Sequence, residues 1–151
     1  MPTAKKSDAA DSEIATPGVT AAELPIREGE EPWTSEELDE VIDDLRAEIV
    51  KHHRAIEQAE AELQNLLRDS TEGAGRDPAD VGSANFERDQ EMSLAANARD
   101  MLKQSELALR MIELGTYGRC ENCGEAIGKG RLQVYPRATM CLSCKQRQER
   151  R

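Results

Sequence analysis

Residues 120–144 read CENCGEAIGKGRLQVYPRATMCLSC, and they hold two Cys-x2-Cys pairs separated by seventeen residues: Cys120 with Cys123, and Cys141 with Cys144. Two residues between ligands let one small turn present both sulfur atoms to a single tetrahedral ion. Gly124 supplies the positive φ that such a turn tends to need. This spacing predicts that all four cysteines bind one zinc ion.

All four expected ligands are sulfur, so the site is coordinatively closed and the zinc is structural rather than catalytic. The alternatives are two disulfides, four unrelated thiols, or a thioredoxin-like redox pair, which normally comes within a βαβ pattern that is not visible here. The segment between the pairs fits a zinc ribbon or a treble-clef-like pair of knuckles. We expect a short strand at Leu132–Tyr135.

A heptad pattern precedes the cysteines and predicts a long helix. Thr34 and Glu37 form a capping-box pattern, and neither Gly nor Pro occurs between Trp33 and Asp69. A helix of about 34 residues is ~50 Å long, and its apolar seam requires a partner helix. We interpret His52 as a tolerated polar position on this seam. The seam comprises Leu38, Ile42, Leu45, Ile49, His52, Ile56, Ala59, Leu63 and Leu66.

A second helix downstream repeats the spacing and is expected to end at Gly115, because glycine is the usual C′ residue of a helix. The linker Ser70–Ser83 holds three glycines and one proline, so the chain turns there. These elements predict an antiparallel coiled-coil hairpin over residues 34–114 with its tip at 70–83. The second seam comprises Met92, Ala95, Ala98, Leu102, Ser105, Leu109 and Ile112.

Charge is distributed unevenly along the chain. The formal net charge is −10, with −7 on residues 33–69 and +5 on residues 115–151. Residues 1–33 have no apolar period and are rich in small and acidic residues, so we predict a disordered acidic tail. There is no apolar run that could cross a bilayer and no signal-peptide pattern, which favours a cytoplasmic location.

The predicted fold class is mainly α: a long antiparallel coiled-coil hairpin followed by a small four-cysteine zinc ribbon. The expected parts are a tail at 1–33, the hairpin at 34–114 and a zinc-finger domain at 115–151, in a monomer. So small a zinc domain has too little core to fold alone, and the metal is expected to supply about 10 kcal/mol or more of folding energy.

The expected hairpin tip contains two acids, Asp77 and Asp80. Asp77 is placed to cap the second helix, with Pro78 at its first position and Asp80 near N3. Both carboxylates favour the positive end of the helix dipole. Two carboxylates at the end of a long rod are also candidates for acting on whatever the rod reaches. Capping and such a function are compatible, and the residues leave both open.

Two motifs carry a resemblance to a known family. The tip, Asp77-Pro78-Ala79-Asp80, is similar to a DxxDxA motif, with Gly82 at the alanine position. The zinc-domain motif is GTYGRCENCG at residues 115–124, followed by Ile127, Arg131, Leu132, Pro136, Ala138, Cys141, Cys144 and Lys145. Through these residues the chain resembles the DksA/TraR family of bacterial transcription factors, over about residues 35–148 and closer to the shorter branch of that family.

The resemblance implies a protein that binds RNA polymerase directly and recognises no specific DNA sequence. It implies that the coiled coil enters the secondary channel of the enzyme and that Asp77 and Asp80 approach the catalytic centre. Open-complex stability, and with it transcription initiation, would change as a result.

Two other functions remain open. A nucleic-acid-binding zinc module is favoured by the +5 charge of residues 115–151, but the acidic rod would be repelled by DNA. A thiol or zinc redox sensor would use the same four cysteines and is compatible with polymerase binding. An enzyme is not expected, because the sequence shows no nucleophile–base pair, phosphate loop or open metal site.

Overall fold

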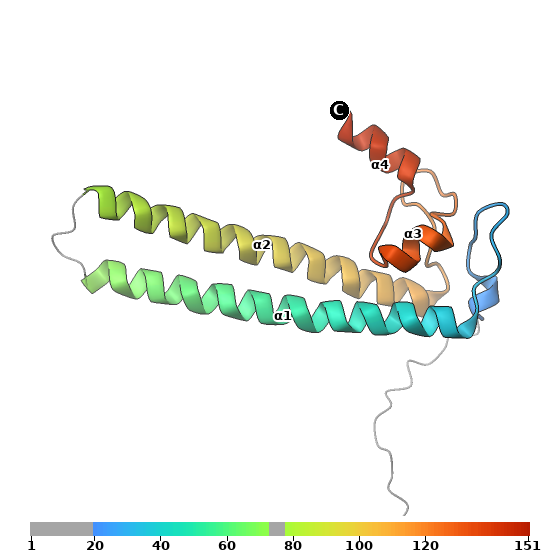
Figure 1. Cartoon of the computed structure of the whole chain (residues 1–151), viewed down its shortest axis with the longest axis horizontal. Coiled ribbons are helices and arrows are strands. Elements are labelled where there is room, and N and C mark those ends of the chain that lie inside the picture. The colour runs from blue at the N-terminus through green and yellow to red at the C-terminus, as the bar shows by residue number, and fades with distance from the viewer. Residues whose placement is uncertain (1–19, 73–77) are drawn as a thin grey trace, which may run out of the picture.

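A computed structural model describes residues 20–72 and 78–151 of the chain, and its architecture is a long helical hairpin with a small domain at its base (Figure 1). In the described part of the chain no helix is both long and apolar enough to cross a membrane. The elements are η1 (Ala21–Glu23), α1 (Ser35–Glu72), α2 (Pro78–Leu114), α3 (Lys129–Val134) and α4 (Leu142–Glu149).

Both long helices begin where the sequence predicts. At the start of α1 the Glu37 amide donates to Thr34 Oγ1 at 3.1 Å, and the Thr34 amide donates to Glu37 Oε1 at 3.2 Å, which completes the capping box. α2 begins at Pro78, whose missing N–H costs nothing at a first helical position. At its end Gly115 has φ 73°, as expected for a C′ residue.

α1 and α2 lie side by side and run antiparallel (Figure 1), so the predicted hairpin is confirmed. The predicted seams face each other: Leu45 and Ser105 are fully buried, and Ala95 is nearly so. Met92 does not lead into the seam as expected, because its side chain is 53% exposed. Val41, outside the predicted seam, is buried as well.

The helices extend further toward the tip than the expected linker at 70–83 allowed. α1 continues to Glu72 and α2 begins at Pro78, so the two helices include residues 70–72 and 78–83 of the expected linker. A Cβ added at Gly82 would meet nothing within 4 Å, so this glycine fills no tight contact within the described residues. The physical reason is that a first-position proline starts a helix early, and one interior glycine costs only about 1 kcal/mol.

The expectation of a disordered tail is wrong for residues 20–33, which lie against the base of the hairpin. Leu24 is 4% exposed and Trp33 is 2% exposed. The Trp33 ring lies 6.4 Å from the Tyr117 ring, centroid to centroid. The burial arises from contacts with residues far along the chain, which leave no local period in the sequence. Residues 1–19 of the expected tail lie outside the described residues.

Glu30 fastens this segment, which we call the strap (residues 20–33), to the start of α3. Its carboxylate oxygens accept hydrogen bonds from the amides of Lys129, at 3.1 Å, and Gly130, at 3.3 Å. These amides would otherwise lack partners at the start of the helix. The strap therefore joins the zinc-domain segment to the residues just before α1.

One hydrophobic core is shared by the strap, the hairpin base and the segment after α2. Residues 132–135 form part of α3 and its end rather than the expected strand, because only Leu132 turns inward while Val134 is 86% exposed. A strand would have placed both side chains on one face. The buried core comprises Leu24, Trp33, Val41, Leu45, Ala108, Ile112, Tyr117, Cys120, Ile127, Leu132, Cys141 and Cys144.

Candidate metal centre and hairpin tip

The first cysteine pair lies in a tight turn that follows α2. Cys120 donates its amide to the Glu125 carbonyl at 2.8 Å, and the Gly124 amide donates to the Cys120 carbonyl at 2.9 Å. Gly124 has φ 76°, so the positive φ that the sequence predicted at this position is confirmed. An antiparallel bridge between Arg119 and Ala126 closes the turn. Both sulfur atoms are thereby presented on one side of a knuckle.

The second pair lies at the start of α4. Cys141 is the N-cap residue and Cys144 is in the first turn, with the Lys145 amide donating to the Cys141 carbonyl at 3.0 Å. The sequence left open a zinc ribbon or a treble-clef-like arrangement. A knuckle that faces the N-terminus of a helix corresponds to the treble-clef-like arrangement. Partial positive charge at the start of a helix favours anionic sulfur there.

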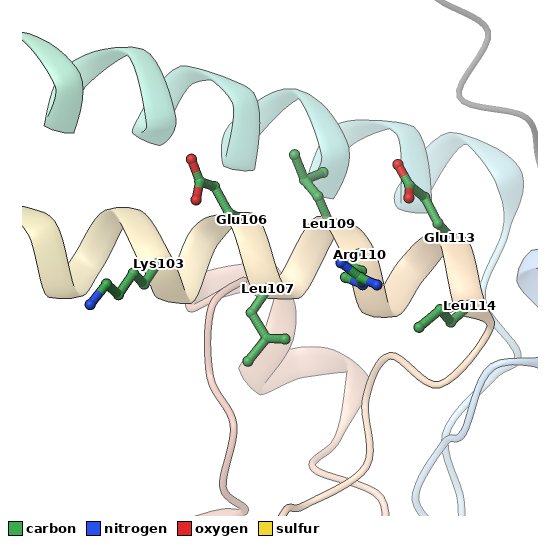
Figure 2. Close-up of a pocket in the computed structure, with 7 residues that line it drawn as sticks. All are labelled: Lys103, Glu106, Leu107, Leu109, Arg110, Glu113 and Leu114. Carbon is green, nitrogen blue, oxygen red and sulfur yellow. The ribbon is translucent and has the colours of Figure 1, made fainter.

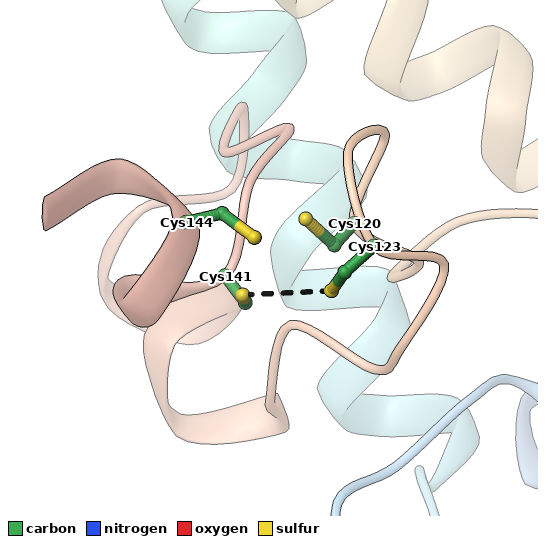
Figure 3. Close-up of side chains that lie close together, drawn as sticks. All are labelled: Cys120, Cys123, Cys141 and Cys144. Atoms are coloured by element: carbon green, nitrogen blue, oxygen red, sulfur yellow. Dashed lines mark hydrogen bonds between the residues drawn. The ribbon is translucent and has the colours of Figure 1, made fainter. Parts of the chain in front are cut away.

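The four sulfur atoms converge on one point (Figure 3). The Sγ atoms of Cys120, Cys123, Cys141 and Cys144 all lie within 4.8 Å of one another. Cys123 Sγ and Cys141 Sγ are 3.8 Å apart. Zinc–sulfur bonds of about 2.3 Å in a tetrahedron place neighbouring sulfur atoms about 3.8 Å apart, so the cluster has the size of a zinc site. All four cysteines are free thiols, which excludes the two disulfides considered above.

The thiols of the first pair have opposite tendencies to ionise. Burial raises the pKa of Cys120, but backbone N–H groups of Cys123, Cys141 and Asn122 outweigh it and lower the pKa to about 6. A backbone N–H of Glu125 favours the Cys123 thiolate, but desolvation and three neighbouring sulfur atoms raise its pKa to about 12. Four thiolates this close therefore need a divalent cation to exist together.

Two side chains and one buried ring support the cluster from outside. Asn122 Nδ2 donates to Cys144 Sγ at 3.3 Å, and Arg147 lies 3.9 Å from the same sulfur. Tyr117 is 2% exposed and its hydroxyl donates to the Pro136 carbonyl at 2.7 Å. Burial raises the pKa of Tyr117, so this hydroxyl stays a donor. Such outer contacts hold the ligand-bearing turns in place.

Of the two expected tip acids, only Asp80 belongs to the described residues, and it lies at the other end of the molecule from the zinc cluster. Asp80 is in the first turn of α2 and is exposed, whereas Asp77 lies outside the described residues. α2 has 37 residues, which at 1.5 Å rise separates its two ends by about 55 Å. The structure therefore brings the four cysteines together and keeps Asp80 far from them.

The zinc domain is attached to α1 by polar contacts that the sequence did not predict. Lys129 Nζ lies 2.7 Å from Glu37 Oε2. Arg137 Nη1 lies 3.4 Å from Glu48 Oε2, and Ser105 Oγ donates to that same oxygen at 3.1 Å. These partners are 57 to 92 positions apart along the chain, beyond the reach of local patterns. The one available signal was a serine, at position 105, on an otherwise apolar seam.

A shallow groove runs along α2 near the zinc domain (Figure 2). Leu107 and Leu114 point away from α1, while Glu106 and Glu113 lie on the side nearer to it. All of its lining residues come from α2, so no second element within residues 20–72 and 78–151 encloses it, as small-molecule sites usually require. We assign this groove no function.

The fold and the cluster define a class of protein: a C4-type zinc finger carried at the base of a long helical hairpin. Residues 115–150 match the family described as "Prokaryotic dksA/traR C4-type zinc finger". The zinc-finger match and the clustered cysteines together give the chain one structural zinc ion.

Relatives extend the match beyond the zinc domain. The "RNA polymerase-binding transcription factor DksA" of Caulobacter vibrioides is 35% identical in an alignment 97 residues long, and the match covers 58% of this chain and 68% of that protein. The protein of the same name from Escherichia coli is 31% identical in an alignment 128 residues long, and the match covers 78% of this chain and 80% of that protein. The chain belongs to the DksA/TraR family.

A solved structure shows the same arrangement. Transcription factor DksA2 from Pseudomonas aeruginosa superposes with a TM-score of 0.62 and is 31% identical, covering 77% of this chain and 85% of that chain. The resemblance inferred from the cysteine and tip motifs is confirmed, as is the predicted mainly α fold class.

Proposed function

We propose that this protein binds RNA polymerase and regulates transcription, acting as a monomer in the cytoplasm. The observation that carries the proposal is membership of a family whose relatives are named as RNA polymerase-binding transcription factors, together with a shared fold. Those names are of transcription factors rather than enzymes, which supports a binding protein without catalytic activity of its own.

The hairpin is the part proposed to enter the polymerase, through its secondary channel. Two packed helices form a rod about 20 Å across and about 55 Å long, a shape suited to reaching an interior site. At the end of the rod, Asp77 and Asp80 would approach the catalytic centre and change open-complex stability. Asp80 supports this role by its exposed position in the first turn of α2.

The zinc ion has a structural role in this proposal, with Cys120, Cys123, Cys141 and Cys144 as its ligands. Four thiolates close the coordination sphere, so the ion supplies folding energy and no reaction step. The zinc domain that the ion stabilises contacts α1 through two ion pairs and thereby supports the hairpin. Specific DNA recognition is not part of the proposal, because residues 33–69 carry −7 and would be repelled by phosphates.

Binding is tested first, with purified core RNA polymerase and the full zinc-loaded chain in a pulldown. We expect a complex that forms without DNA. Binding to nucleic acid alone, with no retention on polymerase, would replace the proposal with a nucleic-acid-binding zinc module whose basic residues lie at 115–151.

The tip is tested with the double variant Asp77→Asn, Asp80→Asn. Asparagine caps a helix about as well as aspartate, so the variant should lose at most ~1 kcal/mol of stability, from the weaker interaction with the helix dipole. It should still fold and bind polymerase, but its effect on open-complex lifetime should disappear. Full regulatory activity in an in vitro transcription assay would show that the two carboxylates are caps and nothing more.

A further inference from the structure

Arg137 and Glu48 together link the zinc domain to both long helices. Arg137 lies in the segment between α3 and the second cysteine pair, and its Nη1 is 3.4 Å from Glu48 Oε2 on α1. Ser105 of α2, which is fully buried, donates to the same Glu48 oxygen at 3.1 Å. One carboxylate therefore receives a donor from the opposing helix and another from the zinc domain.

The Arg137 side chain is held in one orientation by its own domain. Its guanidinium carbon lies 4.6 Å from the centroid of the Tyr135 ring, and its Nη2 donates to the Tyr135 hydroxyl at 2.9 Å. The Arg137 side chain is only 13% exposed and that of Glu48 is 30% exposed. A guanidinium fixed by stacking and by a hydrogen bond offers its remaining donors in a defined direction.

A second attachment lies near the start of α1. Glu37 Oε2 receives Lys129 Nζ at 2.7 Å and Gln133 Nε2 at 2.7 Å. Glu37 and Glu48 are eleven residues apart, so the two attachments are separated by about 16 Å along the helix. The shared hydrophobic core already holds the zinc domain against the base of the hairpin. Two polar attachments on the same helix add directional contacts that further restrict the angle between α1 and the zinc domain.

Arg137 and Glu48 form a partly buried ion pair, in which the loss of one partner matters more than the net attraction. Desolvation of both charges offsets most of their attraction, but removing one partner leaves the other charge buried and unpaired. Orientations of the zinc domain that separate Arg137 from Glu48 are penalised in the same way.

The length of the rod amplifies any change of this angle. From Glu48 to the end of α1 at Glu72 the helix extends about 36 Å at 1.5 Å per residue. A rotation of about 10° at Glu48 therefore moves the tip end of the helix by about 6 Å, roughly two hydrogen-bond lengths.

We propose that Arg137 and Glu48 are positioning residues, which set the angle between the zinc-finger domain and the hairpin. They thereby determine where the tip lies when the zinc domain is bound to the polymerase. The inference rests on the proposed function for its consequence at the polymerase. Its structural part, the angle itself, concerns the free protein alone.

The test uses full-length, zinc-loaded protein with Arg137→Gln and, separately, Glu48→Gln. The matched control is Glu60→Gln, since the Arg99–Glu60 ion pair also links the two long helices but is about half exposed and does not touch the zinc domain. The angle between zinc domain and hairpin is measured from residual dipolar couplings. Open-complex lifetime is measured at saturating protein, so that weaker binding does not mimic a misplaced tip.

We expect Arg137→Gln and Glu48→Gln both to keep their zinc and to change the angle between zinc domain and hairpin by about 10° or more. Both should lose most of their effect on open-complex lifetime at saturation. Glu60→Gln should match the wild type in both measurements. Exchange of the charges, Glu48→Arg with Arg137→Glu, should recover part of both. If Arg137→Gln fails to hold zinc, Glu48→Gln carries the measurement, because it leaves the zinc domain's own residues unchanged.

An unchanged angle in folded Arg137→Gln and Glu48→Gln would overturn the inference. A changed angle with full regulatory effect would overturn it as well. A wild-type protein without effect on open complexes would instead refute the proposed function. The dipolar couplings would still decide whether Arg137 and Glu48 set the angle between the zinc domain and the hairpin.

Discussion

His52 is a buried polar side chain in the seam between α1 and α2. It is 6% exposed, and its Nε2 has no hydrogen-bond partner among the described residues. Burial is the main influence on its pKa and lowers it, Glu48 opposes this effect, and Arg137 and Lys51 add to it. The folded protein therefore holds His52 neutral at pH values where the unfolded chain, with a pKa of about 6.5, begins to bind a proton.

The sign of the resulting pH dependence follows from linkage. The stability contributed by neutral His52 is fully present above about pH 6.5 and is lost as the pH falls below that value. His52→Leu should flatten the pH dependence between pH 7.5 and 5.5 and raise the free energy of unfolding at pH 5.5 by about 1 kcal/mol or more. Urea denaturation at the two pH values measures both effects.

The exposed neighbour provides the control for this prediction. His53→Gln changes the same residue type outside the seam and should retain the wild-type pH dependence. Taking the difference between variant and wild type also removes the pH dependence of the zinc site, which both share. A pH dependence in His52→Leu as steep as that of the wild type would contradict the assignment.

At the scale of elements, the strap is the feature whose contribution is most directly measurable. Removing residues 1–19 deletes none of the described contacts and should leave the melting temperature nearly unchanged. Removing residues 1–33 also deletes Leu24 and Trp33 from the core, a loss of about 3 kcal/mol or more. The melting temperature should then fall by about 10 °C, as measured by circular dichroism on zinc-loaded protein. Equal melting temperatures for the two truncations would show that the strap contributes little.

The two long helices were predictable from the sequence, because their buried residues recur every three or four positions. Leu38 to Leu66 and Ala95 to Ile112 repeat at four and three residues, and both helices follow. The strap was missed because Leu24 and Trp33 are buried by Tyr117 and its neighbours, some 90 residues away, and share no period. α3 was missed because four residues with alternating apolar character do not distinguish a strand from one helical turn.

The candidate site divides in the same way. Two Cys-x2-Cys pairs specify the zinc cluster by spacing alone, and the structure brings all four sulfur atoms together. The contacts of Arg137 with Glu48 depend on how the zinc domain sits on α1, which no local pattern records. Sequence therefore indicated what the zinc domain is, and the structure was needed to show how it is attached.

For the whole molecule, the shared core couples the zinc ion to the hairpin. Val41 and Ile112, on the two long helices, belong to the same buried cluster as Tyr117 and Cys120. Removing zinc with a chelator should therefore loosen the base of the hairpin as well as the zinc domain. Amide exchange, followed by mass spectrometry, should accelerate by about tenfold or more at the start of α1 and the end of α2.

The middle of the hairpin provides the internal reference for this experiment. Around Ala59 and Ala98 the seam is remote from the zinc domain, so exchange there should accelerate less than at the base. Unchanged exchange at the base of the metal-free protein would show that hairpin and zinc domain fold independently.

The strap also has a consequence for synthesis on the ribosome. Trp33 leaves the ribosome well before Cys144 is made, because Cys144 lies 111 positions later and translation adds about 5–20 residues per second. For roughly 5 to 20 seconds the nascent chain exposes an indole and a leucine whose docking surface does not yet exist. α1 and α2 make mostly local contacts and can pair in that interval, but the strap must wait for the last cysteine and the metal. During that time chaperones and proteases can reach this segment, so we expect a shortage of zinc during translation to lower the amount of folded protein.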